Sequence, residues 1–248
     1  MQSLLITGTA AQVGKTVVLT ALMAYWQRYT RRSVGVMKPL DWVPNSASRD
    51  QPGANGDQGR SYPDAELFQQ LFQLDQPTEQ ITPILLSGPA LPPTTAEQTG
   101  LDLDLLWRQF QQLQQQHELV LLEGWGGLGS PLTAETTGAD LAWDWRIPTI
   151  LVVPVEPGAV AQAVAHVALA NQARVHLKGI VLNEVRPCSR QDHADWVPTR
   201  LLQSLTRKPL LGCIPHLANP RDLNSLTQAA ADLELELLLP GIDRVLLS

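Results

Sequence analysis

The sequence predicts an α/β protein of the doubly wound kind, in which helices cover both faces of a mostly parallel sheet. Short, continuously apolar runs alternate along the chain with longer segments of helical periodicity. Parallel strands covered on both faces have this uninterrupted apolar character. The first apolar run also passes through a glycine-containing turn directly into a helical segment, and ligands bind at such turns in this fold class. At 248 residues, we expect a single domain over residues 1–248.

Six strands and six helices are expected in chain order. The strands are Leu4–Thr7, Val34–Met37, Leu119–Glu123, Thr149–Val155, Gly179–Leu182 and Leu210–Ile214. The helices cover residues 16–30, 64–73, 101–117, 158–173, 190–206 and 221–235. Pro198 should split or kink the helix over 190–206, because proline lacks an N–H donor. Residues 41–63 are rich in proline, glycine and small polar residues and predict a long loop.

Composition argues against several classes of function. The formal net charge is −6, so we expect no nucleic-acid partner, which would require a basic face. The longest apolar runs fall far short of the about 20 residues that span a membrane, so no membrane partner is expected. Cys188 and Cys213 fit neither a metal-ligand spacing nor a disulfide framework. Since no signal peptide is apparent either, we expect a cytoplasmic protein.

The segment SLLITGTAAQVGKTVV near the N-terminus has the layout of a phosphate-binding loop. A strand enters a turn at Gly8, and the turn closes on Gly14, Lys15 and Thr16 at the start of a helix. Backbone N–H groups at a helix N-terminus favour anions. Lys15 would contact the β- and γ-phosphates and Thr16 would ligate Mg²⁺, so we expect a nucleoside triphosphate here. The alternative is an ordinary turn in which Lys15 is a solvated surface charge.

Charged residues at other expected strand and helix ends extend this interpretation. Lys38 follows the second strand and could neutralise charge on a transferring phosphoryl group. Glu123 ends the third strand, where a carboxylate suits a Mg²⁺ ligand. Asp64, or Asp57 in the loop before it, could also serve the metal. The alternatives are a surface lysine, a solvated glutamate and an N-cap aspartate.

Two further segments offer backbone groups to a ligand. The glycine-rich turn Gly124–Gly129 directly follows the third strand, and its glycines allow close approach of the backbone. The segment Gly158–Val160 begins a helix after the fourth strand and leaves a helix N-terminus suited to a carboxylate or a phosphate. The alternative for such a helix start is hydrogen bonding to water.

Together these segments resemble dethiobiotin synthetases along nearly the whole chain. The matching segments are GTAAQVGKT, the lysine of VMKPL, PDAELF, ITPILLSGPALPPTTAEQTG, EGWGGLGSPL, VVPVEPGAVAQAV, VLNEVRP and LGCIPHL. The glycine at position 8 lies one residue earlier than in the common phosphate loop, and this displacement is a feature of the family. The segment EGxGGxxSPL is the more specific match, since many ATPases share the phosphate loop.

The resemblance implies a phosphate-loop NTPase fold and an ATP- and Mg²⁺-dependent ligase. The substrate of that family is 7,8-diaminononanoate, which takes up CO₂ as a carbamate. ATP phosphorylates the carbamate, and the neighbouring amine closes the cyclic urea with loss of phosphate. Positioning and electrostatics provide most of the catalysis in such a transfer. The implied catalytic residues are Lys15 and Lys38, and the implied metal ligands are Thr16, Asp64 and Glu123.

The resemblance also implies the other binding residues. The nucleotide contacts would be Val13, Gly14, Lys15, Thr16, Val17, Asn183, Pro215 and Leu217. Of these, Asn183 would bind the adenine edge, with Pro215 and Leu217 beside the base. The substrate contacts would be Trp42, Gly126, Gly158, Ala159 and Val160, with the helix start holding the substrate carboxylate across a dimer interface. A homodimer is therefore implied by the resemblance alone.

The sequence departs from the family pattern at four positions. Ala11 and Gln12 stand where the family commonly has threonine and glutamate, so possible side-chain contacts to phosphate and substrate are lost. Trp42 replaces a small hydroxyl residue, and Glu156 stands where lysine is frequent. These two changes bear on the shape and charge of the diamine pocket. We expect the activity to be retained with a reshaped pocket.

Three alternatives stay open at the level of sequence. One is a related ATP-dependent ligase acting on another acceptor, because the fold and the phosphate loop do not fix the acceptor. Another is a partner-regulated ATPase of the chromosome- and septum-positioning kind. Those proteins carry a second lysine in the loop, where this chain has Ala10, and often use basic surfaces, whereas this C-terminus is acidic. The last is a nucleotide-binding scaffold without turnover.

Overall fold

The computed structural model describes residues 2–43, 62–87 and 101–239. Its centre is a parallel sheet of six strands in the order β2-β5-β1-β6-β7-β8. The strands are β1 (Gln2–Gly8), β2 (Val34–Met37), β5 (Leu119–Gly127), β6 (Thr149–Pro154), β7 (Leu177–Asn183) and β8 (Leu210–Ile214). The six expected strands are therefore confirmed.

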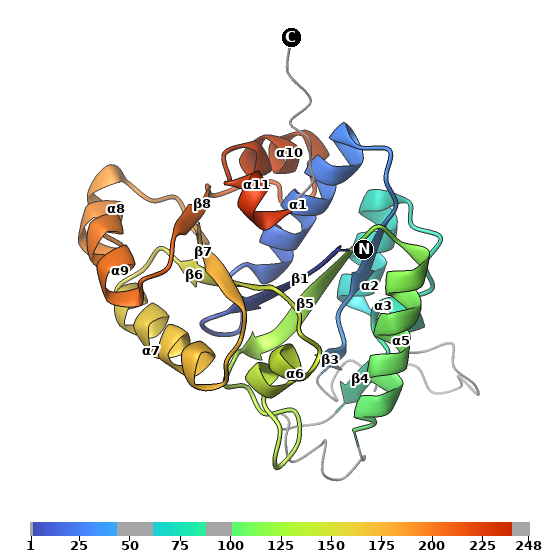
Figure 1. The fold of residues 1–248 in the computed structure, drawn as a ribbon. Helices are drawn as coiled ribbons and strands as arrows, with labels where there is room; N and C mark the ends of the chain where they lie inside the picture. The colour runs from blue at the N-terminus through green and yellow to red at the C-terminus, as the bar shows by residue number, and fades with distance from the viewer. Residues whose placement is uncertain (1, 44–61, 88–100, 240–248) are drawn as a thin grey trace.

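Helices cover both faces of this sheet, as the doubly wound prediction requires (Figure 1). One face packs against α1 (Lys15–Tyr29), α2 (Pro63–Phe72), α3 (Thr78–Ile81), α10 (Leu223–Ala231) and α11 (Leu235–Leu238). The other packs against α5 (Leu103–Gln116), α6 (Gly138–Asp144), α7 (Ala159–Gln172) and α9 (Thr199–Thr206). Alternate residues of β1 illustrate the two cores, since Leu4 and Ile6 face the first layer and Leu5 the second.

Pro198 divides the expected helix over 190–206 into two. The first part is α8 (Arg190–Trp196), which begins with a capping box between Ser189 and Asp192. The second part, α9, begins directly after Pro198, which is its N-cap. The expected split is confirmed, and its cause is the N–H donor that proline lacks.

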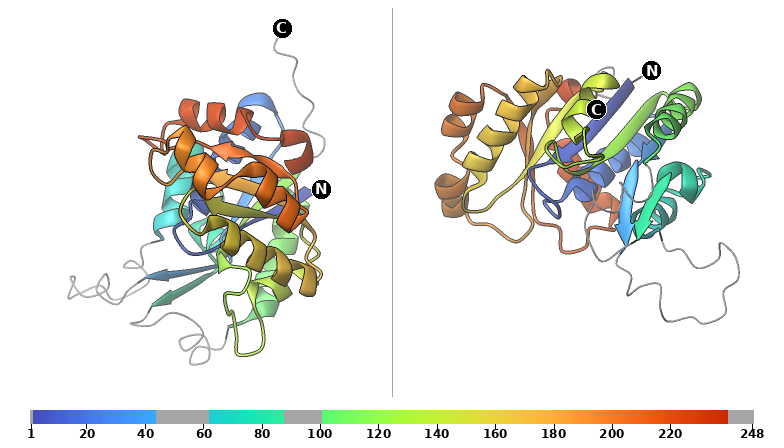
Figure 2. Two further views of the ribbon diagram at one scale, coloured as in Figure 1. Left: turned by 90° about the vertical axis from the view of Figure 1, so that its left-hand side faces the viewer. Right: turned by 90° about the horizontal axis from the view of Figure 1, so that it is seen from below.

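A second, two-stranded parallel sheet is formed by β3 (Leu40–Val43) and β4 (Ile84–Ser87). Figure 2 shows this pair standing apart from the main sheet. The expected loop over 41–63 is wrong at its beginning, because residues 41–43 belong to β3. It is also wrong at its end, because Pro63 begins α2, and residues 44–61 lie outside the described residues. Both strands have only four residues, too few to show a clear periodicity.

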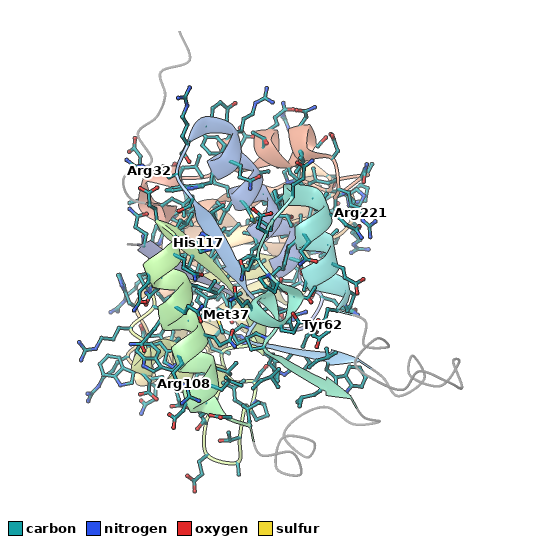
Figure 3. All side chains as sticks on the ribbon, turned by 90° about the vertical axis from the view of Figure 1, so that its right-hand side faces the viewer. Arg32, Met37, Tyr62, Arg108, His117 and Arg221 are labelled. Atoms are coloured by element: carbon teal, nitrogen blue, oxygen red, sulfur yellow. The ribbon has the colours of Figure 1, made fainter. Side chains whose placement is uncertain are left out.

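The carboxyl ends of the six parallel strands lie along one edge of the main sheet. Gly8 of β1 and Asn183 of β7 stand at this edge, and Lys38 directly follows β2. Figure 3 shows β2, which ends at Met37, with α5 on one side and α2, whose N-cap residue is Tyr62, on the other. This edge of a doubly wound sheet is where ligands bind. Within the described ranges, no helix has the length and apolar character needed to cross a membrane.

Candidate active site

The expected phosphate-binding loop connects β1 to α1. α1 begins at Lys15, and the amide of Val18 donates to the Gly14 carbonyl at 3.0 Å in its first turn. A Cβ atom on Gly8 would lie 2.4 Å from the Val13 side chain, which is buried. The displaced glycine therefore has a packing reason, because the loop folds back over position 8 and leaves no room for a side chain.

Asn183 holds this loop in place through its side-chain amide. Its side-chain amide donates to the Val13 carbonyl oxygen at 3.0 Å, and the residue is buried. A Cβ on Gly14 would lie 2.0 Å from the Asn183 Nδ2 atom, and Gly14 has a φ of 92°. Gly14 thus needs both the left-handed backbone and the close approach that only glycine allows. The expected contact of Asn183 with adenine stays a prediction.

Lys15 is buried, and its ammonium group bends over the loop. Its Nζ atom donates to the Ala10 carbonyl oxygen at 2.9 Å. Burial lowers the pKa of Lys15, and the nearby carboxylate of Glu123 partly offsets this effect. The side chain is therefore a desolvated cation within the loop, and the sequence alternative of a solvated surface lysine is wrong.

Thr16 and Glu123 meet at the start of α1, although 107 residues separate them in the chain. The Thr16 hydroxyl donates to Glu123 Oε1 at 2.9 Å. Glu123 is only 3% exposed, and its Oε2 atom has no hydrogen-bond partner among the described residues. An unpaired buried carboxylate oxygen beside a hydroxyl fits a hard cation such as Mg²⁺, which prefers oxygen ligands. The alternative of a solvated glutamate is wrong.

The Glu123 carboxyl lies among several charged groups. Burial raises the pKa of Glu123 to about 7, and Asp64 acts in the same direction. Lys38, Lys15 and the Thr16 hydrogen bond oppose this rise. Because the carboxyl lacks water, its charge depends on nearby cations. A bound cation at Oε2 would therefore stabilise the ionised form.

Lys38 lies between two aspartates. Its Nζ atom is 2.8 Å from Asp41 Oδ1 and also forms an ion pair with Asp64. Burial alone would lower the pKa of Lys38, but the charges of Glu123, Asp41 and Asp64 outweigh it and raise the pKa. Lys38 is thus a buried, paired cation, so the alternative of a surface lysine is wrong. Asp41 was not among the expected site residues.

Asp64 lies in the first turn of α2 but does not cap it. The N-cap is Tyr62, and no side chain caps this helix, so the alternative of an N-cap aspartate is wrong. Asp64 is paired with Lys38 and contributes to the charge around Glu123. Its role toward a metal stays a prediction. The other candidate, Asp57, lies outside the described residues.

The glycine-rich turn continues β5 beyond the expected end of that strand. Gly126 has a φ of 58°, and a Cβ there would lie 2.3 Å from Ser130 Oγ. Ser130 accepts a 2.9 Å hydrogen bond from the Gly127 amide. A Cβ on Gly127 would meet His166 Nε2 of α7 at 2.7 Å. The turn is therefore held closely on both sides, and position 126 requires glycine.

Trp42 belongs to a small apolar cluster at the base of the β3–β4 pair. The cluster consists of Leu40, Leu86, Leu132 and Leu141, with Trp42 and Trp125 packed against it. The Trp42 indole nitrogen is buried and has no hydrogen-bond partner among the described residues. Trp42 thus contacts the same cluster as Trp125 of the glycine-rich turn, and its expected contact with substrate stays a prediction.

The helix start at Gly158–Val160 lies on a different part of the same edge. Gly158 is the N-cap of α7 with a φ of 86°, and no atom lies within 4 Å of a Cβ built on it. Ala159 is fully buried beneath it, whereas Val160 lines a groove of about 780 Å³ between α7 and α9. Apolar side chains form most of this groove, including the exposed Leu201 and Leu205.

The remaining expected nucleotide contacts flank the loop. Val17 packs partly against the first core, as does Leu217, which follows β8. Pro215 directly follows β8 and is exposed. The backbone amide of Glu184 donates to the Ile214 carbonyl at 2.9 Å, so the ends of β7 and β8 are joined here. Contact of these residues with a base stays a prediction.

The chain resembles characterised families over almost its full length. A family model described as AAA domain matches residues 2–221. ATP-dependent dethiobiotin synthetase BioD of Gloeothece citriformis is 47% identical over 243 residues, covering 97% of this chain and all of that protein. The chain belongs to the dethiobiotin synthetase family. The protein of the same name from Synechocystis is 40% identical over 242 residues, covering 96% of this chain and 94% of that protein.

The fold of this dethiobiotin synthetase family member also resembles a solved structure. The cell division ATPase MinD of Pyrococcus furiosus matches with a TM-score of 0.50 and 17% identity, covering 94% of this chain and 98% of that one. Identity this low indicates a shared fold only. The expected phosphate-loop NTPase fold is confirmed.

Proposed function

We propose that this protein catalyses the ATP-dependent carboxylation and ring closure of 7,8-diaminononanoate to dethiobiotin, a step of biotin biosynthesis. One observation carries the proposal beyond family membership. Lys15 and Thr16 at the start of α1, Lys38 after β2 and Glu123 of β5 come from three separate segments and interact around one point at the sheet edge. Two buried cations beside an unsatisfied carboxylate form an arrangement suited to a triphosphate and its metal ion.

The nucleotide would bind at the loop that Asn183 supports. The backbone of Val13–Val17 would surround the phosphates, and Lys15 would exchange its hydrogen bond to the Ala10 carbonyl for phosphate oxygens. Asn183, Pro215 and Leu217 would contact the base. Thr16, Glu123 and Asp64 would hold Mg²⁺, which when bound neutralises charge on the β- and γ-phosphates.

The acceptor would be activated by position and charge. Lys38 is held at the sheet edge by Asp41 and Asp64 and would stabilise the carbamate and the γ-phosphoryl group. The backbone at Gly126 would approach the diamine, with Trp42 limiting the volume of its pocket. The helix start at Gly158–Val160 would receive the substrate carboxylate.

The substrate pocket would be completed by a second copy of the chain. The groove beside Gly158 is apolar, and Leu201 and Leu205 on its rim are 48% and 54% exposed. Exposed apolar surface of this kind typically marks an interface. We therefore propose a homodimer, with α7 and α9 in its interface. A cytoplasmic location fits the two free thiols, Cys188 and Cys213.

Product analysis tests the proposed activity directly. The purified protein is incubated with diaminononanoate, bicarbonate and MgATP, and the products are identified by mass spectrometry. Formation of the cyclic urea with stoichiometric release of phosphate supports the proposal. A reaction without cyclic urea refutes it. Phosphate release with another diamine or carboxylate in its place would indicate a related ligase, the possibility that Trp42 raises.

A further inference from the structure

Three side chains that can ligate metals lie together outside the proposed active site. Glu184 directly follows β7, His193 lies on α8 and Cys213 lies on β8. One ligand atom from each residue can be chosen so that all three atoms lie within 4.8 Å of one another. Sequence spacing did not indicate this group, because its members come from three separate elements.

The geometry of this group is set by its supporting elements. His193 Nε2 lies 2.7 Å from Glu184 Oε1, and all three residues are partly buried. The second carboxylate oxygen, Glu184 Oε2, accepts a hydrogen bond from the His216 backbone amide at 3.2 Å. The capping box of Ser189 and Asp192 fixes the start of α8 and therefore the position of His193. Side chains on such supported elements keep their mutual geometry.

The Cys213 thiol distinguishes this group from a simple ion pair. Its Sγ atom contacts the Ile214 carbonyl at 3.6 Å, a weak hydrogen bond that leaves the sulfur available. The neighbouring Cys188 instead directs its thiol to the Val155 and Arg186 carbonyls, at 3.7 and 3.3 Å. A sulfur, an imidazole nitrogen and a carboxylate oxygen around one point match the ligand types of zinc.

We propose that Glu184, His193 and Cys213 form a Zn²⁺ site with three protein ligands and an open fourth position for water. Zinc would replace the direct hydrogen bond between Glu184 and His193, and Cys213 would bind as the thiolate after losing its proton. Structural zinc sites are closed by four protein ligands, whereas three protein ligands leave the fourth position to water.

The site borders the segment proposed to contact the nucleotide base. Glu184 is bonded to the backbone of Ile214 and of His216, which enclose Pro215. Zinc would hold the ends of β7 and β8 together at this point. The proposal does not depend on the activity of the enzyme, because its ligands take no part in the proposed reaction.

Cobalt substitution tests the proposal with the full chain, free of affinity tags. Co²⁺ is added in the presence of excess Mg²⁺, which occupies the oxygen-rich site at Thr16 and Glu123. A single equivalent should produce a thiolate-to-cobalt charge-transfer band and the visible absorption of a tetrahedral ion. Zn²⁺ should then abolish both signals by competition. Absence of the charge-transfer band in the wild type would overturn the proposal.

Matched variants assign the ligands. Cys213→Ser should lose the charge-transfer band, whereas Cys188→Ser should retain it. His193→Asn should weaken Zn²⁺ binding by about tenfold or more in calorimetry, with the exposed His176→Asn as its control. Melting temperatures establish that each variant is folded, and the histidine pair keeps the test decisive if Cys213→Ser does not fold. Equal Zn²⁺ binding by His193→Asn and the wild type would overturn the proposal.

Discussion

The Thr16 hydroxyl donates a 2.9 Å hydrogen bond to Glu123 Oε1, which joins the first turn of α1 to the middle of β5. This contact brings the two oxygen-bearing side chains proposed for Mg²⁺ to one point. Lys15 and Lys38 act on the same carboxylate from other directions. The site is thus electrostatically balanced around Glu123, and the first predictions concern this balance.

Lys15→Ala should reduce turnover by about a thousandfold or more, because the phosphoryl group loses the cation that contacts it. Circular dichroism should show an intact fold. Lys208→Ala is the control, since Lys208 donates to the Leu177 carbonyl far from the loop. A Lys15→Ala variant with a near-normal rate of cyclic urea formation would contradict the assigned role.

Glu123→Gln should change how stability depends on pH. Burial raises the pKa of Glu123 to about 7 from an ordinary 4.5, so the folded state binds this proton more tightly than the unfolded chain. Its contribution to stability is therefore greatest below pH 4.5 and is lost as the pH rises toward 7. In urea denaturation without divalent ions, the free energy of unfolding of the variant relative to that of the wild type should increase between pH 5 and 8, by on the order of 2 kcal/mol. A difference in the free energy of unfolding that does not change with pH would contradict this prediction.

Asp41→Asn should lower kcat by about tenfold with a smaller change in the KM for ATP, because Lys38 loses one of its two aspartate partners while the phosphate loop is untouched. The alkaline limb of the pH profile should also shift downward, because Asp41 raises the pKa of Lys38. Glu118→Gln is the control, since its 3.9 Å pair with Arg32 is solvent-exposed. An unshifted pH profile would show that Asp41 has only a structural role.

Trp42→Ser should lower the KM for diaminononanoate if the indole restricts the pocket. The change also removes the indole from the apolar cluster of Leu40, Leu86, Leu132 and Leu141. The free energy of unfolding should therefore fall by about 1–3 kcal/mol. Steady-state kinetics measures the first effect and urea denaturation the second. A lower free energy of unfolding with an unchanged KM for diaminononanoate would place Trp42 in the core and outside the substrate pocket.

Leu205→Glu should convert the proposed dimer into a monomer, because a charge would be buried at the groove between α7 and α9. Analytical ultracentrifugation measures the state of association. Leu237→Glu is the matched control, since Leu237 is equally exposed on α11 but is remote from the groove. A wild type that is monomeric at micromolar concentration, or a Leu205→Glu dimer, would contradict the proposed interface.

The main sheet could be predicted because its strands are buried on both faces. The centre of β1 (residues 4–6) and most of β6 (residues 150–154) are uninterrupted apolar runs, and these strands can be recognised without reference to neighbouring segments. The β3–β4 pair could not be predicted, because the four-residue segments LDWV and ILLS are too short to show a strand periodicity. α6 was also missed, although its capping box of Thr137 and Asp140 was a usable signal. The prediction of a single domain stays a prediction.

The positions of the candidate site residues were predictable where a strand or helix end fixed them. Lys15, Thr16 and Glu123 all follow from the parallel arrangement. Other contacts of the candidate site were not predictable. Asp41 pairs with Lys38 through a local turn of the chain, and Asn183 reaches Val13 across 170 residues. Such contacts depend on where side chains and elements lie relative to one another. The hydrophobic periodicity of the sequence carries no information about these positions.

The hydrogen bond from Asn183 to Val13 has a consequence for biosynthesis of the protein. The loop that would hold the phosphates emerges from the ribosome among the first residues, whereas Asn183, whose amide holds it, is added only after about three quarters of the 248 residues. A nascent chain that stops before β7 would carry the glycine-lysine-threonine sequence without its rigid backing. Nucleotide would therefore stabilise the finished protein selectively and offer little protection to truncated or partly synthesised chains.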